Sequence, residues 1–259
     1  MLLGCAMGNL FSLAYVLDVL YNYAQNTQSY GKKIRRGKHF MRVGTKQSSR
    51  SGRPRKFDQD EALGKMQRRL LTTGLSGVSV DDIARSAGLN RPSLAAAFGD
   101  KNAIYAQSAA RYAAMMDERL CRALEADDLE IALRGAFDTA IDTYTAEGPD
   151  GCFVICTAPA EALTNPVCKD ILDQSLNAID ARFLRRLTAE TKRIPAKGVD
   201  LPLVAAQLGA TLHSLALRAR AGWKQDRLKR LSEGAVAHAV AALRGERKAK
   251  NRNRKAQSR

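Results

Sequence analysis

Apolar residues recur every three or four positions along most of the chain after residue 57, which is the spacing of amphipathic helices. Glycines and prolines interrupt this pattern at residues 74, 148–151, 222 and 245 and so mark helix ends. The pattern predicts long helices over residues 58–74, 101–124, 129–145, 166–193, 200–221 and 224–244. We therefore expect an all-α fold.

The stretch 79–98 predicts two short helices around a tight turn. Ser79 and Asn90 are N-cap residues, and Pro92 is tolerated in a first helical turn because its missing N–H needs no partner there. Gly88 is suited to end the first helix in a left-handed conformation. Such a pair is typical of a helix-turn-helix motif, whose second helix enters the DNA major groove. The caps alone would equally fit a helical hairpin on a protein surface.

Positive charge is concentrated at the two ends of the chain. The net charge is +16 over 259 residues, yet residues 1–56 hold 11 Lys or Arg against one Asp, and residues 244–259 hold eight against one Glu. The body between them is near neutral. Basic ends around a neutral body favour a polyanion such as DNA as partner, with solvated tails that aid solubility as the alternative.

Residues 1–24 form a largely apolar run that precedes a basic cluster at residues 32–38. A secretory signal has its positive charge before the apolar run, so this order argues against one. The run approaches membrane-spanning length, but a central Asp such as Asp18 costs about 2.5–3.5 kcal/mol in a bilayer. We favour a segment outside the functional protein, with Met41 as an alternative start. A membrane anchor and a packed extra helix are the alternatives.

The segment 53–116 resembles the DNA-binding domain of the TetR family of bacterial transcriptional regulators. The resemblance rests mainly on GRPRK at 52–56, SVDDIARSAGLNRPSL at 79–94 and AAFGDKNAIY at 96–105. It implies a three-helix N-terminal helix-turn-helix domain whose third helix reads DNA. It also implies a helical C-terminal domain that dimerises through its last two helices and often binds a small inducer.

Four segments are expected along the chain. Residues 1–52 are an apolar N-terminal extension and basic flexible arm, 53–116 the helix-turn-helix domain, 117–245 the regulatory and dimerisation domain, and 246–259 a basic disordered tail. A two-fold dimer would place its reading helices one DNA turn apart, about 34–36 Å, so we expect a near-palindromic operator.

The expected DNA contacts come from the basic arm and the helix-turn-helix segment. Basic residues at 53–56 suit the negative potential of a minor groove. The resemblance implies that Ser79 and Lys101 meet phosphates and that residues 90–93 begin the reading helix. Arg91 is able to bind a guanine edge or a phosphate, and Ala95 replaces a tyrosine that is common in the family. The expected contacts are Arg53, Arg55, Lys56, Ser79, Asn90, Arg91, Pro92, Ser93 and Lys101.

The five cysteines form no C-x-x-C pair, which argues against a disulfide framework or a zinc site and fits a reducing cytosol. Cys152 and Cys156 are one helical turn apart, so both are able to face one cavity. We interpret them mainly as packed apolar residues, with pocket lining and redox sensing as alternatives. His213 is interpreted as a packed, hydrogen-bonded histidine rather than a ligand contact. The candidates for an apolar pocket with a few polar edges are Phe137, Tyr144, Cys152, Phe153, Cys156 and His213.

No catalytic motif, phosphate-binding loop or dinucleotide fingerprint occurs, and the three histidines are far apart in sequence. We therefore predict a protein that is not an enzyme and needs no cofactor or metal. The leading hypothesis is a homodimeric repressor of double-stranded operator DNA, cytoplasmic and nucleoid-associated, that responds to an unidentified small molecule. The alternatives are an architectural or nonspecific DNA-binding protein without inducer and a membrane-tethered regulator.

Overall fold

The computed structural model describes residues 57–148, 150–193, 196 and 198–245. Within these ranges every regular element is a helix, as the apolar spacing predicts. The helices are α2 (Gln59–Thr73), α3 (Val80–Ser86), α4 (Arg91–Phe98), α5 (Lys101–Leu124), α6 (Leu129–Thr145), α7 (Phe153–Thr157), α8 (Pro166–Thr191), α9 (Leu201–Arg220) and α10 (Gln225–Arg244).

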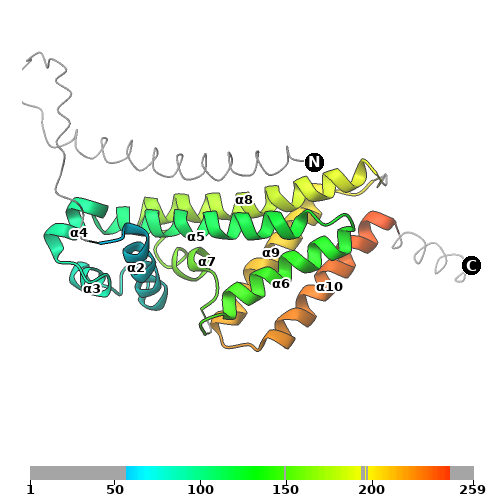
Figure 1. The fold of residues 1–259 in the computed structure, drawn as a ribbon. Helices are drawn as coiled ribbons and strands as arrows, with labels where there is room; N and C mark the ends of the chain where they lie inside the picture. The colour runs from blue at the N-terminus through cyan, green and yellow to red at the C-terminus, as the bar shows by residue number, and fades with distance from the viewer. Residues whose placement is uncertain (1–56, 149, 194–195, 197, 246–259) are drawn as a thin grey trace, which may run out of the picture.

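Helices α2, α3 and α4 lie together at one end of the molecule (Figure 1). Their shared core contains Met66, Leu70 and Ile83, all fully buried, and Leu94 of α4. Burying one such side chain stabilises the fold by about 1.5–3 kcal/mol relative to leaving it in water. Helix α2 also packs on α5, so the three short helices are anchored to the larger part of the molecule.

Helix α5 extends out of this unit and runs beside α8 along the molecule (Figure 1). Helix α6 packs on α5 and helix α9 on α8, and α10 packs on α6 and α9. The expected boundary between residues 116 and 117 falls inside α5, whose N-terminal part packs on α2 and whose remainder belongs to the larger helical layer. A continuous helix therefore joins the two parts rigidly.

A short helix, α7, lies between α6 and α8 and was not among the predicted long helices. Its first residue, Phe153, is fully buried between two tyrosines of α5, with ring centroids 5.4 Å from Tyr105 and 6.1 Å from Tyr112. The hydroxyls of Tyr105 and Thr157 also share a buried hydrogen bond of 2.8 Å. These contacts hold α7 against the middle of α5.

Helices α8 and α9 approach each other closely at Gly209. A Cβ atom at this position would overlap the carboxylate of Asp180 on α8. Glycine therefore leaves room for the Asp180 carboxylate at this point, although it weakens a helix by about 1 kcal/mol relative to alanine.

Among the described helices, none is both long and apolar enough to cross a bilayer. Residues 1–24, on which the membrane-anchor alternative rests, lie outside the described residues, as does the tail 246–259.

Candidate functional site

Local hydrogen bonds build the hairpin of α3 and α4 as the sequence predicts. The Ser79 hydroxyl accepts a hydrogen bond of 3.1 Å from the backbone N–H of Asp82 and caps α3. Gly88 has φ +68°, the left-handed conformation that turns the chain between the helices. The side-chain oxygen of Asn90 accepts from the N–H of Ser93 at 2.9 Å and caps α4. The geometry is that of a helix-turn-helix.

The outer face of α4 carries few groups able to form hydrogen bonds. Leu94 and Phe98 are buried, while Arg91, Ala95 and Ala96 are exposed. Arg91 is therefore the one charged side chain on this helix. Any direct reading of bases from α4 depends on this guanidinium, on the Ser93 hydroxyl and on alanine methyl groups that suit thymine methyls.

Two acidic residues of α3, Asp81 and Asp82, interact with polar side chains of the hairpin. The Arg91 guanidinium lies 3.3 Å from the Asp81 carboxylate, and both side chains are largely exposed. The Ser79 hydroxyl donates to Asp82 at 2.7 Å, and this hydrogen bond lowers the pKa of the Asp82 carboxyl. Exposed ion pairs contribute little to stability, so the Arg91–Asp81 pair is readily exchanged for a contact with another anion.

Lys101 is the first residue of α5 and is partly exposed, next to the Asp100 side chain that caps the helix at the N–H of Ala103. Pro92 is exposed in the first turn of α4. Hence the hairpin brings Ser79, residues 90–93 and Lys101 to one end of the molecule. The expected arm residues Arg53, Arg55 and Lys56 lie outside the described residues.

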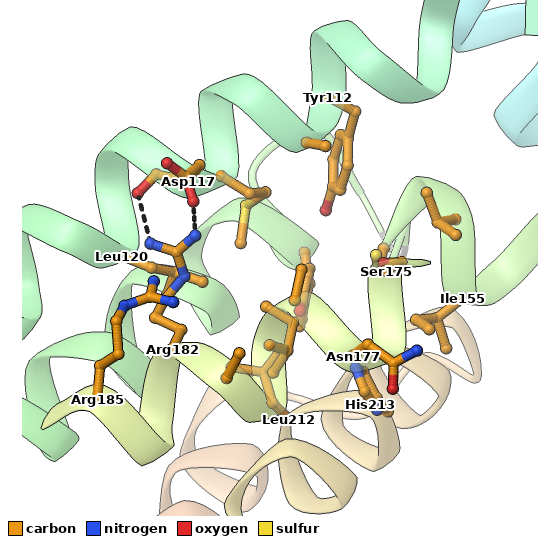
Figure 2. Close-up of a pocket in the computed structure, with 18 residues that line it drawn as sticks. Tyr112, Asp117, Leu120, Ile155, Ser175, Asn177, Arg182, Arg185, Leu212 and His213 are labelled. Carbon is orange, nitrogen blue, oxygen red and sulfur yellow. Dashed lines mark hydrogen bonds and ion pairs between the residues drawn. The ribbon is translucent and has the colours of Figure 1, made fainter. Parts of the chain in front are cut away.

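A cavity of about 550 Å³ lies among α5, α7, α8 and α9, with Tyr144 of α6 on its wall (Figure 2). Most of its wall is apolar, from residues such as Met116, Leu120, Ile155 and Leu212. Its volume is in the range of pockets that enclose small organic molecules.

One wall of the cavity carries a largely buried ion pair. The Arg182 guanidinium of α8 pairs with the Asp117 carboxylate of α5 (Figure 2). It also donates to the Cys121 sulfur at 2.7 Å. Burial and the neighbouring Arg185 charge lower the pKa of Arg182 to about 10, so it is still charged at neutral pH. Breaking a buried pair by removing one partner is strongly destabilising.

The structure corrects the interpretation of His213 as a packed, hydrogen-bonded histidine. Its side chain lines the cavity, and its buried Nε2 atom has no hydrogen-bond partner among the described residues. Burial lowers the pKa of the imidazole, which favours the neutral form. A neutral imidazole with an unpaired nitrogen on a cavity wall is able to bind a ligand through one hydrogen bond.

Two sequence comparisons identify the chain. Residues 68–107 match the family model described as bacterial regulatory proteins, tetR family. The HTH-type transcriptional repressor ComR of Escherichia coli K12 is 27% identical over 193 residues, which cover 70% of this chain and 88% of ComR. The chain belongs to the TetR family of transcriptional regulators. The expectation of a regulator rather than an enzyme is thereby confirmed.

Solved structures agree with the TetR-family fold. Two structures of cysteine mutants of the TetR family regulator CifR, each with a 26-bp double-strand operator DNA, have TM-scores of 0.66 and 0.65 at 23% identity. They cover 72% and 71% of this chain and 98% of CifR. The predicted all-α fold, with an N-terminal helix-turn-helix domain and a helical C-terminal domain, is confirmed.

The cavity of this TetR-family chain includes only half of the expected pocket residues. Tyr144, Cys152 and His213 line it. Phe137 instead stacks on Phe183, with ring centroids 5.8 Å apart. The other two expected residues that do not line it are Phe153, held between the tyrosines of α5, and Cys156, whose sulfur faces the Ala216 carbonyl at 3.9 Å.

The side chains of Cys152 and Cys156 point in different directions because the two residues have different backbone conformations. Cys152 is the extended N-cap residue of α7, so the one-turn spacing of a helix does not carry its side chain to the face of Cys156. Burial raises the pKa of both thiols, to about 11 for Cys156. Protonated thiols are poor nucleophiles, which disfavours the redox alternative and favours packing and pocket lining.

Sequence reasoning missed four residues that shape the cavity: Tyr112, Asp117, Arg182 and Arg185. The one feature of the sequence that could have identified them is Arg182, which interrupts an apolar stripe of α8 directly before the buried Phe183. A charged residue on the buried face of a helix requires a partner. Asp117 on α5 is too distant in the chain for spacing to identify it.

Side chains also join the helix-turn-helix part to the cavity part. The Glu161 carboxylate, in the turns after α7, accepts from the Ser76 N–H at 2.9 Å and from the Ser76 hydroxyl at 2.6 Å. The Arg220 guanidinium at the end of α9 donates to the Leu71 carbonyl near the end of α2 at 2.7 Å. Val154 and Ile155 of α7 line the cavity. These contacts therefore connect the cavity wall to α2 and to the loop that precedes α3.

Proposed function

We propose that this chain is a homodimeric repressor that binds near-palindromic operator DNA and is released from it by a small molecule. The observation that carries the proposal is a well-capped α3–α4 hairpin, with Arg91 exposed on its second helix, joined through α5 to a cavity of about 550 Å³. The names of its relatives agree with this role: ComR is a transcriptional repressor, and CifR was solved with operator DNA.

The proposed DNA contacts are those expected from the sequence. Arg91, Pro92 and Ser93 would enter the major groove with α4, while Ser79 and Lys101 would meet phosphates on either side. Asn90 uses its side-chain oxygen to cap α4, which leaves the amide NH₂ for a phosphate. Arg53, Arg55 and Lys56 would follow the minor groove and compensate for the alanine, in place of a tyrosine, at position 95.

The direct test is to select DNA fragments that the purified full chain retains and to compare the enriched sequence with random DNA in gel shifts over a salt series. We expect a near-palindrome bound roughly 10³-fold or more tightly than random DNA at physiological salt. Equal affinity and equal salt slope on both DNAs would support the architectural alternative and contradict the proposal.

Replacing Lys101 with alanine is expected to weaken binding to operator and random DNA by the same factor. A phosphate contact carries no sequence information, so its removal lowers the magnitude of the slope of log K against log salt by about one for each protomer. The slope and both affinities are measured by gel shift. Lys192→Gln, an exposed change at the C-cap of α8, at the other end of that helix from Lys101, is the control. A change in sequence preference without a change in slope would contradict the phosphate assignment of Lys101.

The proposed dimer forms through α9 and α10, the two last helices that the resemblance implies for it. Most large apolar residues of these helices, including Leu208, Leu215 and Leu228, are buried within the protomer. The outward faces instead carry Leu203 and Leu217 of α9, Leu231 of α10, and small residues. The small residues that are exposed on these helices are Ala210, Gly234 and Ala237. Small residues between exposed leucines suit close helix packing between two protomers.

Replacing Leu217 with glutamate is expected to shift the protein from dimer to monomer. Leu217 is 53% exposed in the protomer, so the change is tolerated by the monomer fold but places charge in the proposed interface. Light scattering coupled to size-exclusion chromatography measures the mass. The control is Leu163→Glu, because Leu163 is 98% exposed and lies outside α9 and α10. An unchanged dimer in the Leu217 variant would place the interface elsewhere.

The proposed release mechanism acts through α7. A ligand in the cavity would contact Val154 and Ile155 of α7. The turns that follow α7 carry Glu161, which binds Ser76 in the loop before α3. A ligand that favours one position of α7 would thus bias the angle between the two reading helices of a dimer. A coupling of about 1–3 kcal/mol is typical for such linkage. Operator binding would locate the protein on the bacterial nucleoid.

A further inference from the structure

The chemistry of the cavity wall narrows the class of ligand, an inference that rests on the proposed function of this cavity. Among the described residues, five buried side-chain nitrogen or oxygen atoms have no hydrogen-bond partner, and three of these belong to cavity residues. They are the Tyr112 hydroxyl, the Arg182 Nε and the His213 Nε2. A buried polar atom without a partner is costly, and a bound molecule with a matching group removes that cost.

The charged groups of the wall leave no buried charge for a ligand to neutralise. The Arg182 guanidinium pairs with the Asp117 carboxylate, so its unpaired Nε belongs to a group whose charge is already balanced. Arg185 is exposed to solvent and has a partner of its own. Within the described part of the chain, no carboxylate other than that of Asp117 lines the cavity. A charged ligand would therefore lose its hydration without meeting a buried, unpaired counter-charge.

His213 is the least compensated polar group on the wall. It comes from α9, whereas Tyr112 comes from α5, and the two side chains lie on different parts of the wall (Figure 2). The Tyr112 hydroxyl has the Cys152 thiol and the Phe153 backbone N–H as close neighbours. Burial alone lowers the pKa of the His213 imidazole, with no contribution from a neighbouring charge among the described groups. The imidazole thus offers a neutral, unpaired nitrogen to the cavity.

We propose that the cavity binds an uncharged, mainly apolar molecule with a hydroxyl group that forms a hydrogen bond with the His213 Nε2. The apolar body of this alcohol or phenol packs on Leu120, Ile155 and Leu212. The Nε2 of a neutral imidazole accepts a hydrogen bond in one tautomer and donates one in the other. A hydroxyl group does both and so matches either tautomer, whereas a carbonyl group only accepts.

The test uses four probes that share an octyl chain: octan-1-ol, octanoate, octylamine and 1-chlorooctane. Calorimetry and thermal shifts on the purified full chain at neutral pH measure their binding. We expect octan-1-ol to bind at least about tenfold more tightly than either ion, because no buried counter-charge offsets the hydration that the ions lose. Equal or tighter binding of octanoate or octylamine, or no binding of any probe, overturns the inference.

Two variants of His213 test the assigned hydrogen bond. His213→Leu removes the nitrogen and keeps the wall apolar, so it should weaken octan-1-ol binding about fivefold. It should not weaken the binding of 1-chlorooctane, which has no hydroxyl group. His213→Gln is the matched variant, because its amide lies near the position of Nε2, and it should keep the octan-1-ol affinity within about twofold. Equal losses in the two variants, or a loss in Tyr112→Phe but not in His213→Leu, overturn the assignment of the hydroxyl to His213.

A gel shift with the selected operator separates the ligand class from the proposed function. If octan-1-ol binds as expected but leaves the operator complex intact, the ligand class stands and the release mechanism fails. If octanoate or octylamine releases the DNA and octan-1-ol does not bind, the repressor function stands and the inference of an uncharged ligand fails.

Discussion

Replacing Asp117 with asparagine is expected to lower the free energy of unfolding by about 3–5 kcal/mol. The Asp117 and Arg182 side chains are only 17% and 9% exposed, so the change leaves a buried guanidinium without its counter-charge. Charge in a low-dielectric interior is costly unless it is paired. Urea unfolding followed by circular dichroism at neutral pH measures the difference between the variant and the unchanged protein.

The exposed pair Glu118–Arg122, on the same helix, is the matched control. Its side chains are 73% and 75% exposed, and Glu118→Gln should change the stability by less than about 1 kcal/mol. A double variant, Asp117→Leu with Arg182→Met, should recover most of the stability, because a buried pair is often replaced by apolar residues at little cost. Equal, small effects of Asp117→Asn and Glu118→Gln would contradict the assignment of a buried charge pair.

Replacing Arg91 with alanine is expected to weaken operator binding by about 30-fold or more. A bidentate arginine–guanine interaction contributes about 1–3 kcal/mol to binding. A dimer makes one such interaction at each half-site, so the variant loses two of them. No other charged side chain lies on α4, so the outer face has no substitute. Gel shifts or fluorescence anisotropy with the selected operator and with random DNA measure the effect.

Arg85→Ala is the control for this prediction. Arg85 is also an exposed arginine of the hairpin and also pairs with an acidic residue of α3, Asp82, but it lies outside the reading helix. A decrease in affinity at Arg91 that is larger on operator than on random DNA assigns Arg91 to a base edge. A decrease by the same factor on both DNAs assigns it to a phosphate. If Arg91→Ala weakens DNA binding no more than Arg85→Ala does, Arg91 does not contact the DNA.

The predictions that succeeded concern groups close in sequence. Ser79 caps α3 and Asn90 caps α4 through hydrogen bonds to backbone N–H groups three residues away. Gly88 adopts the left-handed conformation that such a turn requires. The first residues of α5 and α6 agree with the predicted ranges because Asp100 and Asp128 cap these N-termini in the same way. Each of these features depends on a few consecutive residues.

The predictions that failed concern which residues meet across the fold. Cys156 and Phe153 were expected in the cavity, but α7 turns them toward α9 and α5 instead. Leu208 and Leu228 lie on the two helices that the resemblance implies for the dimer interface, but they are buried within their own protomer. In each case the apolar character was correctly predicted, and the neighbour that covers it was not, because apolar contacts are non-directional.

The sequence by itself determined the helices, their caps and the helix-turn-helix hairpin, because these depend on hydrogen bonds and apolar spacing within one or two turns. Only the tertiary structure decided that Asp117 and Arg182, 65 positions apart, form a charge pair on a cavity wall. It also decided that His213 faces the cavity with an unpaired nitrogen. The physical reason is that a cavity is the space left where five helices fail to fill one another's grooves, a property of their packing and of no single segment.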